Sequence, residues 1–133
     1  MAQKHSGHLL VYLEEYLKMS EISYFAGLFD GEGSVRYKCM PRIRHDRPKK
    51  PIYNTWEIRL EIAMTDKKII DWVHKLVGVG TANPRKVKEG RKPQWRWICR
   101  YKDAYHVAKL LEPYSKIKLD QIKKIINHYK EKK

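Results

Sequence analysis

The chain has 133 residues, of which 42% are apolar, so it is long enough for one compact domain with a hydrophobic core. Lysine and arginine number 29 against 15 acidic residues, which gives a net charge of +14 at pH 7. A positive field of this size favours a polyanionic partner, either nucleic acid or an anionic membrane surface. The alternative is a basic protein whose charges form only a solvated face.

Cysteine content and hydropathy exclude several classes of protein. Cys39 and Cys99 are too few for a disulfide framework and lack the paired spacing of a zinc site, so we expect two reduced, partly buried thiols. No apolar run approaches the ~20 residues of a membrane span. The N-terminus has no signal-peptide or transit-peptide pattern. We therefore expect the chain to act inside the cell, in a bacterial, phage or archaeal cytoplasm or in an organelle that encodes it.

Residues 1–19 are predicted to be an extension that precedes a domain formed by residues 20–133. The apolar periodicity of residues 9–17 indicates either a short helix packed on the domain or a loosely docked segment. Ser20 is predicted to cap a new helix that runs through Phe29, since a serine hydroxyl accepts a bond from a free N–H group at a helix start. The glycines that follow end this helix.

Alternation of apolar and polar residues predicts strands over 34–40 and 56–64. The segment between them, 41–51, is rich in arginine, lysine and proline and is predicted to be a loop. Together these segments predict an antiparallel hairpin with a long basic connection. Its inward face would carry Val35, Tyr37, Cys39, Trp56, Ile58, Leu60, Ile62 and Met64.

The order of one helix followed by two strands then repeats. Thr65 is predicted to cap a helix over 66–77, and glycine stops this helix. Its buried stripe would be Ile69, Ile70, Trp72, Val73 and Leu76. A weaker strand broken by proline is expected over 81–87, and a clear strand over 94–101. The second strand would turn inward the side chains of Trp95, Trp97, Cys99 and Tyr101.

Two helices complete the predicted domain. The first covers 103–111, with Asp103 as its cap, and the second covers 118–129. The second would turn inward Leu119, Ile122, Ile125 and Ile126. The full order of elements predicts an α+β domain that contains a doubled strand–strand–helix unit.

Residues 25–33 read Phe-Ala-Gly-Leu-Phe-Asp-Gly-Glu-Gly and stand out chemically. The small pair Ala26 and Gly27 would let another helix backbone approach closely. Two carboxylates, Asp30 and Glu32, follow at the helix C-terminus, where the helix dipole already places negative potential. A divalent cation would offset this cost, because hard cations prefer carboxylate and carbonyl oxygens. The alternative is an ordinary capped helix followed by an acidic turn.

This segment resembles the namesake motif of the LAGLIDADG homing endonucleases. Four positions differ from the family name: Phe25 stands for the first Leu, Phe29 for Ile, Gly31 for the second Ala and Glu32 for the second Asp. The order of elements is similar to the family's αββαββα domain, in which a saddle-shaped antiparallel sheet binds DNA. Residues 113–118, followed by Gln121, also resemble a family pattern near its end.

A single motif copy implies a homodimer, with the two motif helices packed on each other. The resemblance implies a dimer interface of Phe25, Ala26, Gly27 and Phe29. It implies that Glu32 and the carbonyl of Gly31 bind the metal, Mg²⁺ or another divalent ion such as Mn²⁺. Asp30 would be structural. Glutamate in place of aspartate keeps the carboxylate and lengthens its reach.

Two further residues match family positions in the catalytic pocket. Lys118 would be the basic residue, and its alternative is a solvated lysine on a helix surface. Asp66 would be a polar residue that organises solvent, and its alternative is an ordinary acid at a helix N-terminus. Phosphodiester hydrolysis needs metal-activated water and a positive charge near the phosphate.

The polar strand faces suit the major groove, which admits a two-stranded ribbon. The predicted DNA contacts are Ser34, Arg36, Lys38, Arg42, Arg44, Glu57, Arg59, Glu61, Asn83, Arg85, Arg96 and Arg100. Loop residues placed for phosphate contacts are Lys49, Lys50, Lys86, Lys88 and Arg91. The alternative for each single residue is a solvated outer strand face.

The prediction is a homing endonuclease that makes a double-strand break in a long, near-palindromic DNA target by metal-dependent hydrolysis. One alternative is a non-cleaving nucleic-acid binder on the same fold, either an intron RNA maturase or a DNA-binding regulator. Another is an unrelated basic α+β RNA-binding protein, which would be monomeric and independent of metal. A membrane-surface role has little support, since the basic residues lie on strands as much as on a helix.

Overall fold

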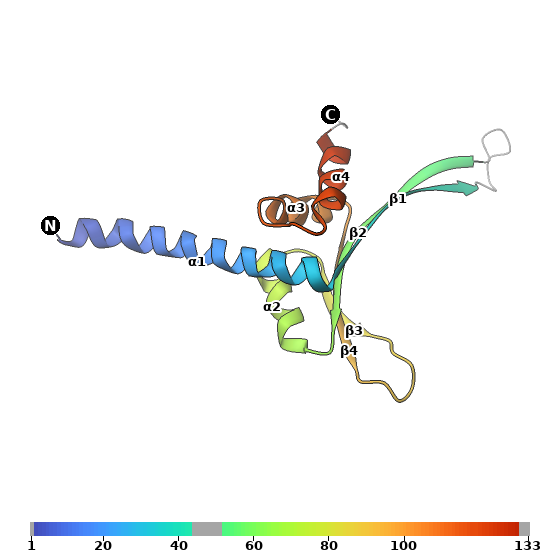
Figure 1. Ribbon diagram of the computed structural model, residues 1–133, viewed down its shortest axis with the longest axis horizontal. Helices are drawn as coiled ribbons and strands as arrows, with labels where there is room; N and C mark the ends of the chain where they lie inside the picture. The colour runs from blue at the N-terminus through green and yellow to red at the C-terminus, as the bar shows by residue number, and fades with distance from the viewer. Residues whose placement is uncertain (1, 44–51, 131–133) are drawn as a thin grey trace.

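The computed structural model of the chain describes residues 2–43 and 52–130. Within these ranges the elements are α1 (Ala2–Glu32), β1 (Gly33–Ile43), β2 (Ile52–Met64), α2 (Lys67–Val77), β3 (Thr81–Arg85), β4 (Gln94–Arg100), α3 (Lys102–Leu111) and α4 (Leu119–Lys130). The strands form one antiparallel sheet in the order β1-β2-β4-β3. Figure 1 shows the helices on one side of this curved sheet. The predicted α+β class is confirmed.

The core lies between the helices and the inward face of the sheet. Leu60 and Ile62 of β2 and Trp97 of β4 are fully buried, as period-two alternation predicts for a half-buried strand. Phe25 of α1 packs edge-on against Trp97, with 5.8 Å between ring centroids. Burial of each such side chain contributes about 1.5–3 kcal/mol, so this layer fixes α1 on the sheet.

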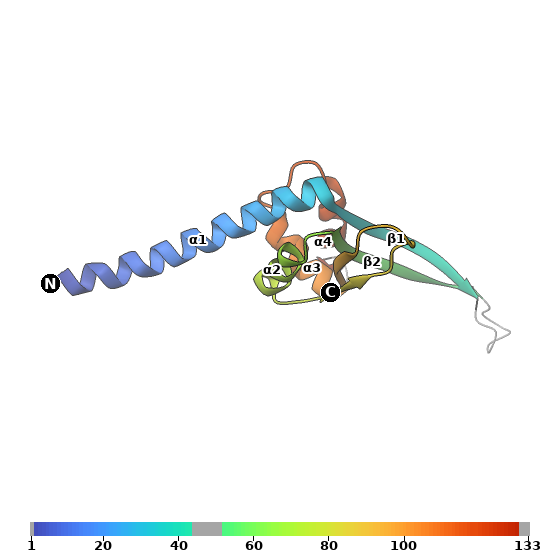
Figure 2. The ribbon, with the colours of Figure 1, turned by 90° about the horizontal axis from the view of Figure 1, so that it is seen from below.

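Helix α1 is continuous from Ala2, and the predicted helix start at Ser20 is wrong. The hydroxyl of Ser23 donates to the carbonyl of Ser20 at 3.1 Å, a bond that serines make inside helices. The preceding residues include several good helix formers, so the ladder runs through and there is no free N–H group to cap. The first half of α1 projects beyond the body (Figures 1 and 2). Among the described residues, no helix is long and apolar enough to cross a membrane.

Both prolines in the sheet lie on edge strands, which explains two wrong strand boundaries. Pro41 was expected in a loop but pairs with Asn54 on β1, and Pro84 was expected to interrupt its strand but pairs with Trp95 on β3. Each strand occupies one edge of the sheet. An edge strand tolerates proline because the missing N–H can face solvent.

Two predicted helix caps are also wrong. Asp66, not Thr65, caps α2, and its side chain accepts a bond from the N–H of Ile69 at 3.3 Å. Helix α3 begins after Tyr101, whose φ of 56° turns the chain sharply, so Asp103 lies inside the first turn. The N–H of Tyr101 still donates to Ile58 of β2 at 3.1 Å, which holds this turn against the sheet.

Gly78 and Gly80 flank the exit from α2 with φ values of 74° and 85°. A Cβ at Gly78 would meet open space, whereas a Cβ at Gly80 would lie 2.6 Å from the carbonyl oxygen of Ile98. Gly78→Ala is therefore expected to cost only the left-handed backbone penalty of about 1–2 kcal/mol. Gly80→Ala should cost at least about 1 kcal/mol more, because backbone of β4 must shift. Urea unfolding of the two variants measures the difference, and equal midpoints would contradict it.

Candidate nucleic-acid interface and motif-helix terminus

The register of the sheet aligns three arginines in one row across it. Arg36 on β1 pairs with Arg59 on β2, and Arg59 pairs with Arg100 on β4. Side chains that pair directly across antiparallel strands point to the same face, and like charges placed in this way repel one another. This row is therefore an unfavourable arrangement for the free protein and a favourable one for a bound anion.

The other predicted contacts share this face, which no helix of the described ranges covers (Figure 1). Lys38 pairs with Glu57, Ser34 with Glu61, and Arg96 with Asn83. The described members of the basic face are Ser34, Arg36, Lys38, Arg42, Glu57, Arg59, Glu61, Asn83, Arg85, Arg96 and Arg100. Arg44, Lys49 and Lys50 lie outside the described residues. The register thus brings together eleven of the twelve predicted contacts, including Arg42, which was predicted to lie in the loop and instead lies on β1.

Two glutamates hold arginines of the basic face in place. Glu57 accepts from Arg36 Nε at 2.8 Å and lies 3.6 Å from a guanidinium nitrogen of Arg59. The hydrogen bond from Arg36 keeps the pKa of Glu57 below its usual value, so this carboxylate is ionised at neutral pH. Glu61 lies 3.6 Å from Arg96 in the same way. Each pair uses only part of a guanidinium group, which carries five N–H donors, and the arginine side chains stay partly exposed.

Tyr101 joins the basic face at a hollow of about 410 Å³. Sequence alternation placed Tyr101 on the buried side, and this prediction is wrong, since 51% of its surface is exposed. Its positive φ reverses the direction that the strand pattern implies. The hollow is lined by Arg42, Thr55, Trp56, Glu57, Ile58, Arg59, Arg100 and Tyr101. Nothing in the residue pattern signals such a backbone turn at a tyrosine.

Asp30 ties the end of α1 to the segment before α4. Its carboxylate is buried and accepts from the N–H groups of Lys116 at 2.8 Å, Ile117 at 3.3 Å and Lys118 at 3.2 Å. Burial by itself raises the pKa of Asp30, but the three N–H donors outweigh it and leave the pKa below its usual value. The predicted structural role of Asp30 is confirmed.

The same contact positions Lys118. Its ammonium donates to the backbone carbonyl of Asp30 at 2.6 Å, so it lies at the C-terminal end of the motif helix. A cation is favourable there, because the helix dipole places negative potential at this end. The ammonium has three N–H donors and uses one of them here. Lys118 is therefore a held, half-buried lysine and not a freely solvated one.

Glu32 is the last residue of α1 and is exposed, as is Gly31 before it. Their oxygens are of the kind that Mg²⁺ prefers. No group of three or more His, Cys, Asp or Glu residues suited to a metal ion occurs among the described residues. One copy of the chain therefore brings together too few such side chains at this point, and a cation site would need further ligands from elsewhere.

Three of the four residues predicted for a dimer interface are unavailable to a partner. Phe25, Ala26 and Phe29 are fully buried in the chain's own core, so that prediction is wrong. Only Gly27 is exposed, because positions 25, 26 and 29 lie on the opposite side of the helix. A Cβ at Gly27 or Gly31 would meet nothing within 4 Å.

Asp66 has a structural role in the described contacts, since its side chain caps α2. This is the alternative that the sequence left open for it. The bond occupies one carboxylate oxygen, and the residue is exposed. The solvent-organising role stays a prediction.

Comparison with known proteins gives the fold. No family model matches the chain, and no curated protein matches its sequence. The homing endonuclease I-CvuI in complex with its target aligns with a TM-score of 0.66 at 20% identity, over 84% of this chain and 67% of that one. The archaeal intron-encoded homing endonuclease I-Vdi141I, complexed with DNA, aligns with a TM-score of 0.60 at 14% identity, over 80% and 65%.

The LAGLIDADG homing endonuclease I-GzeII, in complex with its DNA target, aligns with a TM-score of 0.60 at 18% identity, over 84% of this chain and 36% of that one. The aligned region is thus about two thirds of some of these proteins and about a third of others. The chain has the fold of the LAGLIDADG homing endonucleases, as the motif predicted.

Proposed function

We propose that this protein is a homing endonuclease that cuts both strands of a long, near-palindromic DNA site in a reaction that requires a divalent metal. The observation that carries the proposal is the arginine row of Arg36, Arg59 and Arg100 on an open sheet, in a fold whose structural neighbours are DNA endonucleases. The exposed carboxylate of Glu32 at the end of the motif helix supplies the chemistry that a mere binder does not need.

The proposed active form is a homodimer. A single Glu32 is too few ligands for a hydrolytic metal site, and two-fold pairing of motif helices would bring a second carboxylate to the same place. Gly27 and Gly31 support this pairing, because an exposed face without side chains lets two helix backbones approach closely. A symmetric dimer presents the same surface to each half-site, which predicts a near-palindromic target.

In this mechanism Glu32 and the carbonyl of Gly31 would hold the divalent ion, and both fit a hard cation. The ion, when bound, supplies activated water and charge stabilisation at the phosphate. Lys118, held by Asp30, directs its ammonium to the same end of α1, where it can stabilise negative charge on the phosphate. The basic face binds and orients the duplex by contacts to phosphates and base edges.

Arg100→Ala is expected to weaken DNA binding by about 1–3 kcal/mol and to relax sequence preference at one base position in each half-site. The physical reason is the loss of one outward guanidinium from the arginine row. Binding titrations at several salt concentrations measure both effects. Lys109→Ala is the matched control, because this exposed lysine lies on α3, where it stacks on Tyr105. Equal losses in the two variants would contradict the assignment.

A cleavage selection tests the function directly. A randomised duplex library is incubated with Mg²⁺ and either the wild type or Glu32→Gln, and cut ends are sequenced. The proposal expects the wild type to enrich one long, near-palindromic site and the variant to bind without cutting.

If both proteins bind DNA and neither cuts, the proposal fails and the non-cleaving binder replaces it. Binding to structured RNA would then separate a maturase from a DNA-binding regulator.

A further inference from the structure

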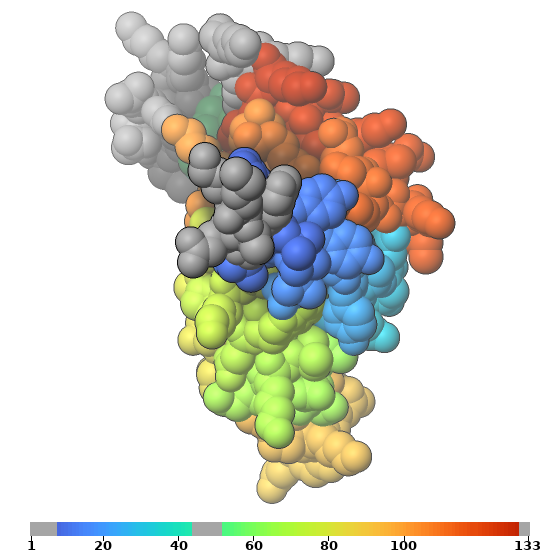
Figure 3. Space-filling view, turned by 90° about the vertical axis from the view of Figure 1, so that its left-hand side faces the viewer, coloured from blue at the N-terminus to red at the C-terminus, as the bar shows by residue number. Residues whose placement is uncertain are grey.

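The first half of α1 carries large apolar side chains that the rest of the chain leaves exposed. Figure 3 shows the molecule from the free end of α1, and in this view α1 (blue) lies between α2 (green) and the α3–α4 region (orange and red). Exposed fractions run from 45% to 69% for Leu9, Leu10, Val11, Tyr12, Leu13, Tyr16, Leu17 and Met19. A helix that is apolar around most of its circumference is normally buried, and a large exposed apolar patch marks an interaction surface.

One stripe of this segment continues into the motif. Alternating steps of three and four residues along α1 select an exposed face opposite the core, made of Leu10, Leu13, Leu17, Ser20, Tyr24, Gly27 and Gly31. We call this stripe the α1 seam. Steps of three and four are the a and d spacing of a coiled coil, in which two helices pack along their whole length. The α1 seam thus joins the apolar extension to the glycines of the motif without interruption.

We propose that residues 9–19 form a second dimerisation element, in which the α1 seam packs in parallel against the α1 seam of a second copy of this chain. This inference rests on the proposed homodimer and assigns the N-terminal extension a role in it. The seam is self-complementary, as a two-fold interface requires.

Contact area supports this assignment. From Ser20 to Gly31 the seam spans only about 17 Å of helix, at about 1.5 Å per residue, and two of its positions are glycines that bury little area. A standard interface buries about 800 Å² per partner. The seam from Leu10 to Leu17 adds leucines at three consecutive a and d positions, which nearly doubles the length of the contact.

Charges beside the seam favour the parallel orientation. Glu14 and Glu21 flank it on one side, and Leu9 and Tyr16 flank it on the other. In a parallel pair, the flank with Glu14 and Glu21 faces the flank with Leu9 and Tyr16 of the second copy. The glutamates then meet apolar side chains. An antiparallel pair would set glutamate against glutamate, which is repulsive. The parallel orientation also places both Glu32 residues at the same end.

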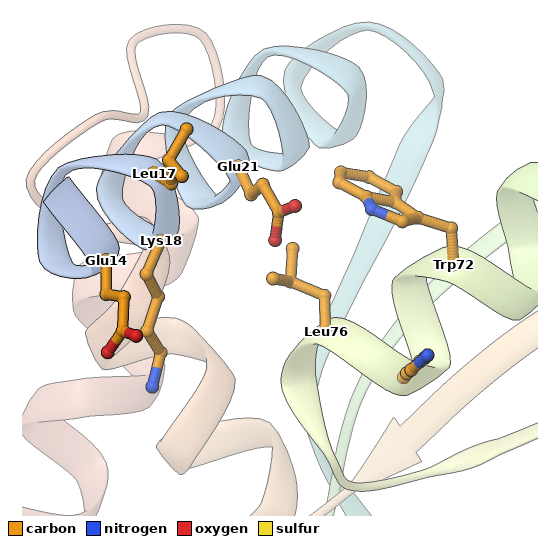
Figure 4. Close-up of a pocket in the computed structure, with 7 residues that line it drawn as sticks. Glu14, Leu17, Lys18, Glu21, Trp72 and Leu76 are labelled. Atoms are coloured by element: carbon orange, nitrogen blue, oxygen red, sulfur yellow. The ribbon is translucent and has the colours of Figure 1, made fainter. Parts of the chain in front are cut away.

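A groove between α1 and α2 lies directly beside the α1 seam. Helices α1 and α2 line an open groove of about 490 Å³, and Leu17 belongs to both the groove and the seam. Figure 4 shows Trp72 and Leu76 of α2 directed toward α1 across it. Side chains of a second helix that reach past Leu17 would meet Trp72 and Leu76 there, beside four charged residues of the groove: Glu14, Lys18, Glu21 and Lys75.

Sedimentation equilibrium of the full chain tests the inference. The double variant L13E/L17E places charges in the seam and is expected to raise the dimer Kd by roughly 100-fold or more. The matched control is V11E, since the exposed fraction of Val11, 57%, lies between those of Leu13 and Leu17, and Val11 points away from the seam. A dimer with the wild-type Kd in L13E/L17E would overturn this inference and leave the proposed function intact. A wild type that stays monomeric on DNA would overturn both.

Cross-linking tests the orientation. On a Cys39→Ser background, L13C is expected to form a disulfide-linked dimer under mild oxidation, because d positions face each other only in a parallel pair. V11C is the control and should stay monomeric. Cys99 does not interfere, since burial raises its pKa to about 12 and the thiol stays protonated. Absence of a covalent L13C dimer, with wild-type Kd retained, would overturn the parallel seam.

Discussion

Glu32→Gln is expected to lower the rate of DNA cleavage by at least about a thousand-fold while DNA affinity changes little. Glutamine keeps the shape of the side chain and removes the charge that balances a divalent ion. Among the described residues, no cluster of other ligands could replace it. Single-turnover cleavage of a plasmid that carries the selected site, at saturating protein, measures the effect.

Glu15→Gln is the matched control for this prediction, because Glu15 is an exposed glutamate on the same helix, remote from its C-terminus. It should cleave at the wild-type rate. Titration of Mg²⁺ adds a readout of metal binding, and Glu32→Gln should need a higher concentration for any residual activity. If the cleavage rate of Glu32→Gln were within ten-fold of the wild-type rate, the assignment of Glu32 as a metal ligand would be wrong.

Asp30→Asn is expected to destabilise the fold by about 2–4 kcal/mol. The buried carboxylate accepts three backbone N–H groups, and an amide can present only one oxygen to them. The donors of Lys116, Ile117 and Lys118 would then be incompletely paired. Urea unfolding measures the loss, and the cleavage rate should also fall, because Lys118 is held by the same contact.

The pH dependence of stability provides a second test of Asp30. Its pKa is lowered in the folded chain, so its contribution is fully present above the unfolded value of about 3.9. It is lost as the pH falls through the lower, folded pKa. The difference in unfolding free energy between wild type and Asp30→Asn should therefore be constant at neutral pH and shrink below about pH 4.

Asp71→Asn is the control for both measurements. Asp71 is exposed and pairs only with Lys67, at 3.0 Å, a surface contact worth less than about 1 kcal/mol. If Asp71→Asn and Asp30→Asn lost equal stability, the three N–H bonds to the Asp30 carboxylate would not be the cause of the loss in Asp30→Asn.

Strand faces were predictable from the sequence because alternation has a period of two and depends on local geometry alone. The inward positions of Leu60 and Ile62 and the outward positions of Arg36 and Arg59 follow from it directly. Helix caps were less predictable. Thr65 and Asp66 are both good caps by composition, and the folded backbone decides between them: Asp66 is extended, with φ −90° and ψ 100°, and its carboxylate accepts from the N–H of Ile69.

The residue pattern of the motif helix did not predict which of its sides faces the core. Small residues at Ala26 and Gly27 suggested a contact with another helix, but a helix has two sides, and the sequence does not say which one faces the core. Packing of Phe25 on Trp97 decides it, since the aromatic side chains need burial more than alanine does. Ala26 therefore lies inward and Gly27 outward.

The sequence by itself determined the α+β class, the polar and apolar faces of the strands and the motif with its two acids, because each depends on local periodicity or composition. Only the tertiary structure decided the row of Arg36, Arg59 and Arg100, since strand register is a long-range property. It also decided that Asp30 anchors Lys118, 88 residues away along the chain, and that α1 runs unbroken from Ala2. These contacts join segments distant in sequence, and no local pattern records them.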